Sequence, residues 1–431
     1  MAETKAGFMQ IKRRHLLAGA GAMALTAASG AKADDVLQEI FNTRGRSAWN
    51  DQFDSRYSAN QKIETNQPIF SPATLSYVQQ AISNYQMIEA SGGWPMVPAA
   101  TKLELGVVDQ AVGPLRRRLM VSGDLDSKAG MSNAFDSYVD AAVKRFQARH
   151  GLPADGVVGE YTFKMMNVPV STRLMQLRTN LVRLETMANS FLGERYVVVN
   201  IPAAEIEAVE NGRVVQRHTA IVGKVSRQTP TLNSKINEVI MNPYWNAPES
   251  IIRKDIVPLM QKNPNYLEEN AIRIYNPGDL ENEIDPRTID WNDPATPDYV
   301  GKLRFRQDPG KINAMASVKI NFPNAHAVYM HDTPQQGLFN QLMRFESSGC
   351  VRVQNVRDLV VWLLRDTPGW DRRAIEAQIK TRESAPVQLT QPVPNYFTYI
   401  SAWSTGSGVV HFRDDIYGRD GSQDLQLSSA G

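Results

Sequence analysis

SSGCVRV at residues 347–353, with YMHDTP at 329–334 just before it, is the stretch around which this chain is organised. Cys350 is the only cysteine among 431 residues, so no disulfide can form within the chain. A cysteine becomes a strong nucleophile when an imidazole can hold or take its proton, and His331 lies nineteen residues upstream. The alternative for a free cysteine is a small buried hydrophobic side chain. The polar residues around Cys350 favour the edge of a pocket, and thus nucleophilic catalysis.

Both segments are expected to be strands that enter loops. Alternate residues of a strand share a face, so Tyr329 and His331 should point one way. By the same parity Cys350 and Arg352 share a face, while the apolar residues between them face a core. Gly349 has no side chain, which would let a substrate carbonyl approach the backbone N–H groups of Gly349 and Cys350 as an oxyanion hole.

The two segments together resemble the signature of the L,D-transpeptidase (YkuD-type) catalytic domain, in which a nucleophilic cysteine follows an upstream histidine. Many members have a histidine two residues before the cysteine, whereas this chain has Ser348, as does the larger Gram-negative subfamily. VGKVSRQTP at 222–230 and EVIMNPYWNAP at 238–248 resemble the same subfamily. The resemblance implies that Cys350 and His331 are catalytic and that Ser348 and Gly349 form the oxyanion loop.

Three further residues are expected to bind substrate. The resemblance places Trp245 at the substrate pocket, although Trp245 could instead be a core aromatic, and strand parity turns Tyr329 toward the same pocket as His331 and Cys350. Arg352 either holds a substrate carboxylate bidentately or braces the loop through backbone carbonyls, and the sequence does not separate these roles. Asp332 follows His331 directly and so faces the opposite way, which argues against a catalytic triad.

The remaining histidines are weaker candidates for the base. His411 lies in a Val-Val-His-Phe-Arg setting that predicts a solvent-facing strand position. Parity places His326 on the strand face opposite His331, and His150 and His218 lie in other elements. No His-Glu-x-x-His motif or cysteine pair indicates a metal, and no phosphate-cradling glycine loop appears, so no cofactor is expected.

Residues 103–169 predict a second functional module. Helical spacing of apolar residues appears at 108–120 and at 136–149, where Val139, Val143 and Phe146 form one stripe. FQARHGLPADGVVGEYTFKMMN at 146–167 resembles the three-helix peptidoglycan-binding module. Its motif residues are interpreted as core and turn positions, and none is assigned to ligand binding.

The predicted architecture is multi-domain α+β, with a mostly-β catalytic sandwich carrying a helical capping insertion and preceded by the three-helix module. A helix at 75–85 and an amphipathic helix at 174–191 flank the module, and Asn211-Gly212 predicts a hairpin turn. The insertion is charged and rich in Pro and Asn, as lids and binding loops often are. The expected parts are a signal peptide (1–33), a helical scaffold segment (34–102), the peptidoglycan-binding domain (103–169), a linker helix (170–194), the catalytic domain (195–385) with its capping insertion (249–304), and C-terminal strands and tail (386–431).

The N-terminus predicts export. Lys12-Arg13-Arg14-His15-Leu16-Leu17, an Ala/Gly-rich apolar segment and Ala31-Lys32-Ala33 have the layout of a signal peptide with a twin-arginine-like start. A retained membrane anchor is the alternative, but the apolar segment is shorter than the roughly 20 residues of a span. We expect cleavage and a free periplasmic protein.

Composition and charge fit a soluble globular protein and exclude some partners. The chain is 42% hydrophobic and 21% charged. Without residues 1–33, which hold five basic residues and one acidic residue, 42 basic and 44 acidic residues remain. A net charge of −2 gives no general attraction to nucleic acid or anionic lipid.

The resemblance implies a reaction on peptidoglycan tetrapeptide stems, which serve as both donor and acceptor. Cys350 would attack the carbonyl of the third stem residue, D-Ala would leave, and a second stem's amine would take the acyl group to give a 3-3 cross-link. Alternatives from other classes are a cysteine L,D-carboxypeptidase that uses water as acceptor, and a non-catalytic peptidoglycan-binding protein. The sequence indicates no protein partner.

Overall fold

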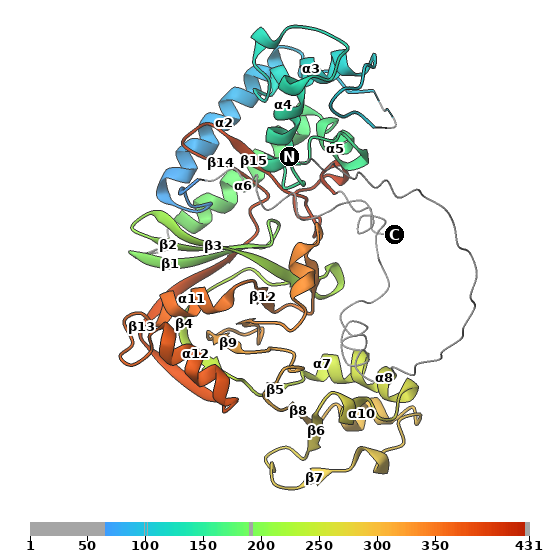
Figure 1. The fold of residues 1–431 in the computed structure, drawn as a ribbon, viewed down its shortest axis with the longest axis vertical. Helices are drawn as coiled ribbons and strands as arrows, with labels where there is room; N and C mark the ends of the chain where they lie inside the picture. The colour runs from blue at the N-terminus through green and yellow to red at the C-terminus, as the bar shows by residue number, and fades with distance from the viewer. Residues whose placement is uncertain (1–64, 99, 101, 189–192, 427–431) are drawn as a thin grey trace, which may run out of the picture.

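The computed structural model describes residues 65–98, 100, 102–188 and 193–426. The predicted signal peptide and most of the predicted scaffold segment before residue 65 lie outside these residues. In Figure 1 three parts follow one another along the long axis: a helical part, a β sheet in the middle, and a smaller mixed part at the opposite end.

The helical part begins with one long helix and continues as the expected three-helix module. Its elements are α2 (Pro72–Ala90), α3 (Val112–Val121), η2 (Ser127–Ala129), α4 (Ser137–Arg149), α5 (Glu160–Met166) and α6 (Val170–Ala188). Asp136 starts α4 by accepting hydrogen bonds from the backbone N–H groups of Tyr138 and Val139. The predicted stripe of Val139, Val143 and Phe146 is fully buried in the module's own hydrophobic cluster.

α6 does more than link two domains. Leu174, Leu177 and Leu184 pack with Val78 and Ala81 of α2 in a second cluster that also contains side chains of the sheet. The helix at 75–85 was predicted too short, since α2 runs from Pro72 to Ala90, and α6, which lies within the expected linker at 170–194, is part of a helical layer on the sheet's outer face.

The region predicted to be catalytic is one sheet that closes on itself. Its strands are β1 (Arg195–Asn200), β2 (Glu205–Glu210), β3 (Arg213–Gly223), β4 (Leu232–Met241), β9 (Val318–Asn321), β10 (Met330–His331), β11 (Phe345–Ser347), β12 (Val351–Val353) and β13 (Ala385–Thr398). These described strands have the order β11-β3-β12-β10-β9-β4-β13-β1-β2, and a β2–β3 pairing closes the ring. The expected turn lies between β2 and β3, with both Asn211 (φ 49°) and Gly212 (φ 72°) left-handed.

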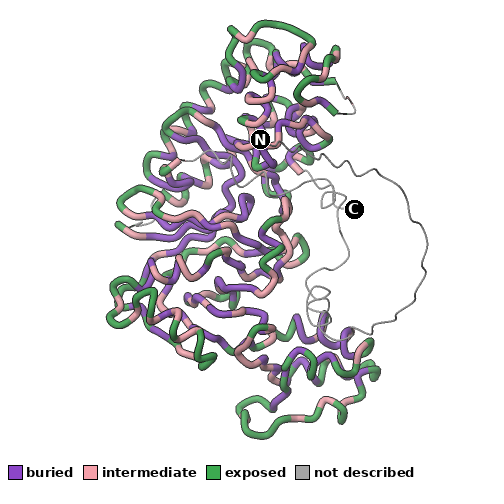
Figure 2. Tube along the Cα trace, viewed as in Figure 1, coloured by how far each residue is buried: buried purple, intermediate pink, exposed green. Residues whose placement is uncertain are grey.

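The sheet buries both of its faces. Val197, Val199 and Ile206 belong to an inner cluster that α11 (Val356–Leu364) also joins, whereas Tyr196 and Val198 face the α2–α6 layer. Figure 2 shows the resulting buried centre within an exposed rim. Leu359 and Leu363 of α11 face this core.

The predicted boundary between residues 385 and 386 needs correction. β13 crosses it and runs between β1 and β4, so the C-terminal strand is a central member of the catalytic sheet. The element before β13 is α12 (Arg372–Thr381), and a separate hairpin of β14 (Ala402–Ser404) and β15 (Val410–Phe412) follows.

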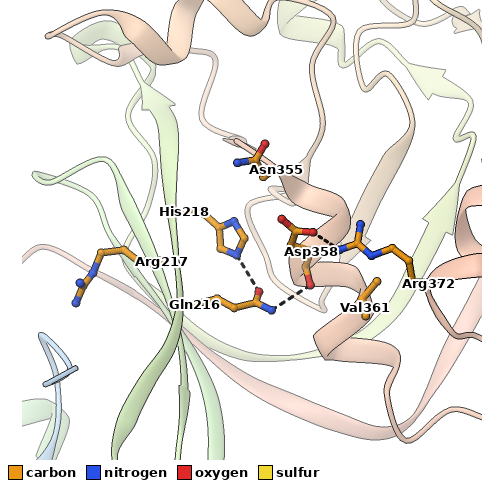
Figure 3. Close-up of a pocket in the computed structure, with 7 residues that line it drawn as sticks. All are labelled: Gln216, Arg217, His218, Asn355, Asp358, Val361 and Arg372. Atoms are coloured by element: carbon orange, nitrogen blue, oxygen red, sulfur yellow. Dashed lines mark hydrogen bonds and ion pairs between the residues drawn. The ribbon is translucent and has the colours of Figure 1, made fainter. Parts of the chain in front are cut away.

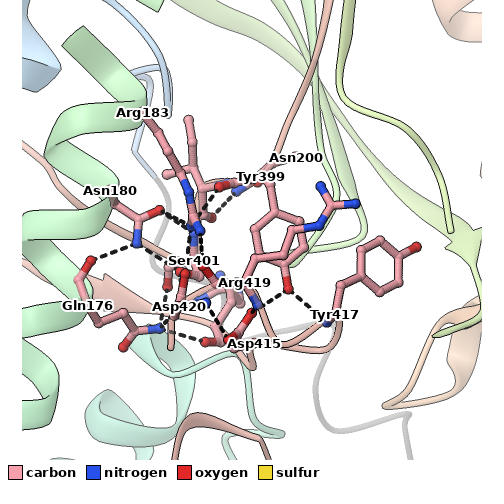
Figure 4. A network of polar contacts seen from close by, with 12 residues as sticks. Gln176, Asn180, Arg183, Asn200, Tyr399, Ser401, Asp415, Tyr417, Arg419 and Asp420 are labelled. Carbon is pink, nitrogen blue, oxygen red and sulfur yellow. Dashed lines mark hydrogen bonds and ion pairs between the residues drawn. The ribbon is translucent and has the colours of Figure 1, made fainter. Parts of the chain in front are cut away.

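The C-terminal segment is tied to α6 by the polar network of Figure 4. Asp420 accepts hydrogen bonds from Arg183 (2.6 Å) and from Ser401 (2.5 Å). Tyr399 donates to Asp415 at 2.7 Å, and its oxygen accepts the Tyr417 N–H at 2.9 Å. The buried carboxylates are paired, as burial requires, and they fix the position of Tyr417 next to the catalytic sheet.

The capping insertion is a small domain with its own core. It contains β5 (Trp245–Asn246), α7 (Glu249–Ile251), η4 (Ile252–Ile256), α8 (Val257–Lys262), α9 (Tyr266–Glu269), β6 (Ile272–Tyr275), β7 (Glu283–Ile284), η5 (Pro286–Thr288), α10 (Thr296–Val300) and β8 (Arg304–Gln307). A four-stranded sheet of order β5-β8-β6-β7 recruits residues beyond both ends of the predicted range 249–304. We call this part the cap. Among the described helices, none is both long and apolar enough to cross a membrane.

Candidate active site

Cys350 lies directly before β12, in the turn that follows β11. β12 pairs in parallel with β10, with Met330 opposite Val351 and His331 opposite Arg352. The Val351 N–H donates to the Tyr329 carbonyl at 3.0 Å, which places Cys350 beside Tyr329. Met330 and Val351 lie in the inner core and His331 and Arg352 do not, as the predicted parity requires, whereas Cys350, just before β12, also packs against this core.

The thiol of Cys350 is half-buried and its hydrogen bonds come from Tyr329. Burial raises the pKa of Cys350, while hydrogen bonds from the backbone and the side chain of Tyr329 lower it. The positive charges of Lys319 and Arg352 act in the same lowering direction, but the net shift is upward. The resting sulfur is therefore a protonated thiol at neutral pH.

Tyr329 links the thiol to the cap. Its pKa is raised well above the usual value by burial and then by the charge and hydrogen bond of Cys350, whereas a hydrogen bond with the Trp245 side chain lowers it. Trp245 is 5% exposed and belongs to the cap's core, against which Tyr329 also packs. Trp245 is thus a core aromatic that also reaches the site, so the two interpretations of this residue do not exclude each other.

His331 is buried beside these groups as a neutral imidazole. Its Nδ1 lies 2.6 Å from the Asp332 carbonyl oxygen, which can only accept, so Nδ1 carries the proton and Nε2 the lone pair. Burial, Arg352 and Lys319 lower the pKa of His331 to about 3, against the opposing effect of the Asp332 hydrogen bond. The rings of His331 and Tyr329 meet edge to face at 5.5 Å.

The direct hydrogen bond expected between nucleophile and base is not formed. Within the part of the chain that the structure describes, no hydrogen bond joins Cys350 to His331, and the partner of the thiol is Tyr329. The strand register explains the offset, because His331 lies opposite Arg352 and not opposite Cys350. Catalytic hydrogen bonds are often long in proteins without substrate, so the role of His331 stays a prediction.

Asp332 points away from the imidazole, as parity predicted. Its carboxylate accepts hydrogen bonds from Ser317 Oγ (2.5 Å), from the Ser317 N–H (3.2 Å) and from the Thr333 N–H (2.8 Å). It orients the loop and not the base.

Arg352 braces the loop between the two catalytic strands. Its guanidinium is 2% exposed and donates to the Gln335 side chain at 3.0 Å. Burial lowers the pKa of Arg352 to about 10, with Glu346 and Cys350 opposing. This contact with a side-chain oxygen of the loop favours the bracing role, and the binding of a substrate carboxylate stays a prediction.

The predicted oxyanion hole needs one correction. The Gly349 N–H already donates to Ser347 Oγ at 3.1 Å, because a nearby serine hydroxyl competes for turn N–H groups. Ser347 Oγ in turn donates to the Cys350 carbonyl at 2.5 Å. Among the described residues none accepts the Cys350 N–H, which leaves that donor for an oxyanion, whereas the Tyr329 hydroxyl is engaged with the sulfur.

The nucleophile loop, residues 347–350, rests on the connection between β3 and β4. Thr229 Oγ1 donates to the Gly349 carbonyl at 2.8 Å, and Arg227 donates to Ser348 Oγ at 3.0 Å. The Thr229 N–H donates to Tyr417 OH at 3.1 Å, which brings in the C-terminal segment of Figure 4. Gly349 has φ 114°, a conformation open to glycine but costly for other residues.

Sequence reasoning missed four residues of this site. Lys319 faces His331 across β9–β10 and lies 4.4 Å above the ring of Tyr329. Arg227, Thr229 and Asp255 support the nucleophile loop from two other segments. The motif at 222–230 contained Arg227 and Thr229, but only the tertiary structure shows what they touch.

The other histidines are not placed to act on Cys350, and one was mispredicted. His411 is 5% exposed and stacks on Trp403 at 4.9 Å, so its expected solvent-facing position is wrong. His326 is exposed in a turn, whereas His150 is buried against aromatic rings.

His218 lines a separate cavity of about 350 Å³, shown in Figure 3, whose walls contain none of the site residues named above. Its Nε2 lies 3.0 Å from Gln216 Oε1, and its Nδ1 lies 3.0 Å from the Gln354 carbonyl.

Comparisons with known proteins agree with this geometry. Residues 194–373 match the family model described as L,D-transpeptidase catalytic domain (YkuD), and residues 109–166 match the model described as "Putative peptidoglycan binding domain". The chain therefore carries a YkuD-family L,D-transpeptidase catalytic domain. Both resemblances seen in the sequence, and the predicted fold class, are confirmed.

The chain is also similar to a curated protein. A "Putative L,D-transpeptidase" of Haemophilus influenzae is 37% identical over 247 residues, which are 57% of this chain and 48% of the relative. The chain thus spans about half the length of that curated relative.

Among solved structures, an L,D-transpeptidase from Mycobacterium smegmatis is 14% identical, with a TM-score of 0.24 over 48% of this chain and 58% of its own. An L,D-transpeptidase structure from Xylanimonas cellulosilytica is 16% identical, with a TM-score of 0.23 over 70% of this chain and 99% of its own.

Proposed function

We propose that this protein is an L,D-transpeptidase that forms 3-3 cross-links in peptidoglycan through an acyl-enzyme on Cys350. The observation that carries the proposal is the half-buried thiol held by Tyr329, with two cations and a neutral imidazole around it, inside a domain of this family. An inert core cysteine would have aliphatic neighbours only and no hydrogen-bond donors aimed at its sulfur.

In the acylation step the Cys350 sulfur attacks the carbonyl carbon of the third residue of a tetrapeptide stem. His331 Nε2 takes the thiol proton, since Nδ1 is committed to the Asp332 carbonyl. The imidazole closes on the sulfur when substrate fills the site. A thioester forms, the bond to the terminal D-Ala breaks, and the imidazolium returns its proton to the leaving amine.

The negative oxygen of the tetrahedral intermediate needs donors that are already in place. The Cys350 N–H is suited to this role because the Gly349 N–H is occupied, and the Tyr329 hydroxyl can turn from the sulfur to the oxyanion once the sulfur has bonded to the carbonyl carbon. Lys319, above the Tyr329 ring, adds positive charge beside the developing anion.

In the second step a side-chain amine of another stem attacks the thioester and the thiol is regenerated. The peptidoglycan-binding domain at 109–166 would keep the enzyme on polymeric wall, where donor and acceptor stems are concentrated. We further propose that residues 1–33 export the protein to the periplasm, which cell fractionation with a tagged chain would test.

Intact-protein mass spectrometry with a carbapenem tests the central claim. One adduct on the wild-type protein, mapped to Cys350 and absent in Cys350→Ala, is the expected result. Digestion of tetrapeptide-rich peptidoglycan then separates the reaction types: cross-linked dimers indicate transpeptidation, and trimmed monomers indicate a hydrolase. A protein that forms no adduct but still binds peptidoglycan would be a non-catalytic wall-binding protein.

A further inference from the structure

The cap touches the nucleophile loop from two directions. On one side Trp245 of the cap core contacts Tyr329, whose hydroxyl holds the thiol. On the other side Asp255 of the cap binds Arg227, which reaches Ser348. Resting on the proposed function, we propose that Arg227 and Asp255 are positioning residues, through which the cap fixes the loop that carries Cys350 for acyl transfer.

Arg227 and Asp255 form a bidentate ion pair. The guanidinium donates to both carboxylate oxygens, from Nη1 at 2.5 Å and from Nη2 at 3.0 Å, and Nη1 also donates to Ser348 Oγ at 3.0 Å. Asp255 is 6% exposed, so this carboxylate depends on its partner. A planar guanidinium can serve the carboxylate and the hydroxyl at once, whereas a lysine ammonium cannot keep this fork.

Asp255 owes its position to an irregular helix. Residues Ile252–Ile256 form a π-helical segment between α7 and α8. Ile252 and Ile256 of this segment are buried in the cap core, while Asp255 leaves that core toward the β3–β4 connection. Such widened turns redirect side chains and occur frequently at functional sites.

Displacement of Arg227 would be transmitted to the sulfur. The segment around Arg227 lies against the loop backbone: a Cβ added to Gly349 would lie 3.5 Å from the Gln228 carbonyl oxygen. Thr229, two residues on, donates to the Gly349 carbonyl. Because the nucleophile loop is held through Ser348 and Gly349, the position of Cys350, which follows them directly, depends on these contacts.

A purely structural role of the pair is the competing interpretation. A buried ion pair at an interface could hold the cap in place without affecting the sulfur. The two interpretations differ in what the loss of the pair changes, since a structural role affects the melting temperature and a positioning role affects the reactivity of Cys350.

The test measures carbapenem acylation of Cys350 in full-length protein, in Asp255→Asn, Arg227→Gln, Arg227→Lys and the Asp255→Asn/Arg227→Gln double variant. We expect each single variant to lower the second-order acylation rate constant by about 10-fold or more, since misplacement by about 1 Å can cost on the order of 100-fold. The double variant should be no slower than the worse single variant, because both break one contact. Arg227→Lys should not rescue the rate.

The matched control is Asp298→Asn, which breaks another ion pair of the cap, that of Asp298 with Arg253. Asp298 is largely exposed and does not reach the loop, so the acylation rate should change by less than about two-fold. The pH profile of Cys350 alkylation by iodoacetamide should also move in the Arg227 and Asp255 variants and not in the control. Melting temperatures show whether each variant is folded.

Unchanged acylation in folded Arg227→Gln, or multiplicative losses in the double variant, would overturn the proposal. If Asp255→Asn does not fold, Ser348→Ala decides, because it removes the same fastening without exposing a buried charge. Failure of the proposed function is distinguishable, since the wild-type protein would then form no adduct on Cys350 at all.

Discussion

Replacing Tyr329 by phenylalanine removes one hydroxyl from the point where the cap, the thiol and the expected oxyanion meet. In the folded protein this hydroxyl hydrogen-bonds the sulfur and thereby lowers the pKa of Cys350. A hydrogen bond to a charged group contributes about 1.5–3 kcal/mol. At about 1.4 kcal/mol for each pKa unit, its loss should raise the pKa of Cys350 by about one to two.

Each unit by which the pKa of Cys350 rises lowers the thiolate fraction at neutral pH about 10-fold, because burial already keeps this pKa above its usual value. Alkylation by iodoacetamide, which needs the thiolate, should therefore be about 10- to 100-fold slower in Tyr329→Phe at pH 7. Carbapenem acylation should fall further, since the same hydroxyl is a proposed oxyanion donor and such donors contribute on the order of 100-fold or more.

The assay compares alkylation from pH 6 to 10 with acylation at pH 7, both by intact mass. Tyr299→Phe is the matched control, because Tyr299 is an exposed cap tyrosine remote from the sulfur contacts described above. A Tyr329→Phe protein that is folded and is alkylated as fast as wild type across this range would refute the reasoning, since the hydroxyl would then not stabilise the thiolate.

Two predictions concern stability. His331 is neutral when buried, with a pKa of about 3 against about 6.5 when unfolded, so its contribution is present above pH 6.5 and lost as pH falls toward 3. At pH 5 this loss is about 2 kcal/mol of the free energy of unfolding. In urea unfolding, the free energy of unfolding of His331→Gln should fall about 2 kcal/mol less than that of the wild type from pH 7 to pH 5. Equal falls in the two proteins would contradict the prediction. Gly223→Ala should lose about 2–3 kcal/mol in the same assay, because a Cβ would lie 2.2 Å from the Arg227 carbonyl oxygen and 2.5 Å from the Thr229 nitrogen. Gly159→Ala, which meets open space at φ −96°, is its control and should change little.

Short-range patterns predicted which faces the site residues occupy. A strand has a period of two, so Met330 and Val351 were enough to place His331 and Arg352 on the face opposite the core, but Cys350, just before its strand, packs against that core. The turn at Asn211-Gly212 and the module's helices are equally local, and they appear within a few residues of the predicted bounds.

The sequence did not predict the register between paired strands or the side chains that cover and bind the site from neighbouring segments. The offset that places Tyr329, and not His331, beside the sulfur follows from the β10–β12 pairing. His411 was predicted to face solvent because its own strand alternates, but Trp403 of the paired strand covers it. The Gly349 N–H donates to the hydroxyl of Ser347, two residues away. The prediction of an oxyanion hole from backbone N–H groups did not consider that a nearby serine hydroxyl competes for them.

The charge arrangement of the site favours a particular order of proton movements in the proposed reaction. Lys319 and Arg352 both lower the pKa of Cys350 and of His331, so they favour the thiolate and disfavour the imidazolium. With the thiol protonated and the imidazole neutral at rest, little thiolate is exposed to oxidants before substrate arrives. Once His331 accepts the thiol proton it is an unusually strong acid, because the same cations surround it. The imidazolium should therefore pass its proton to the leaving amine readily, which drives the thioester forward rather than back to the stem.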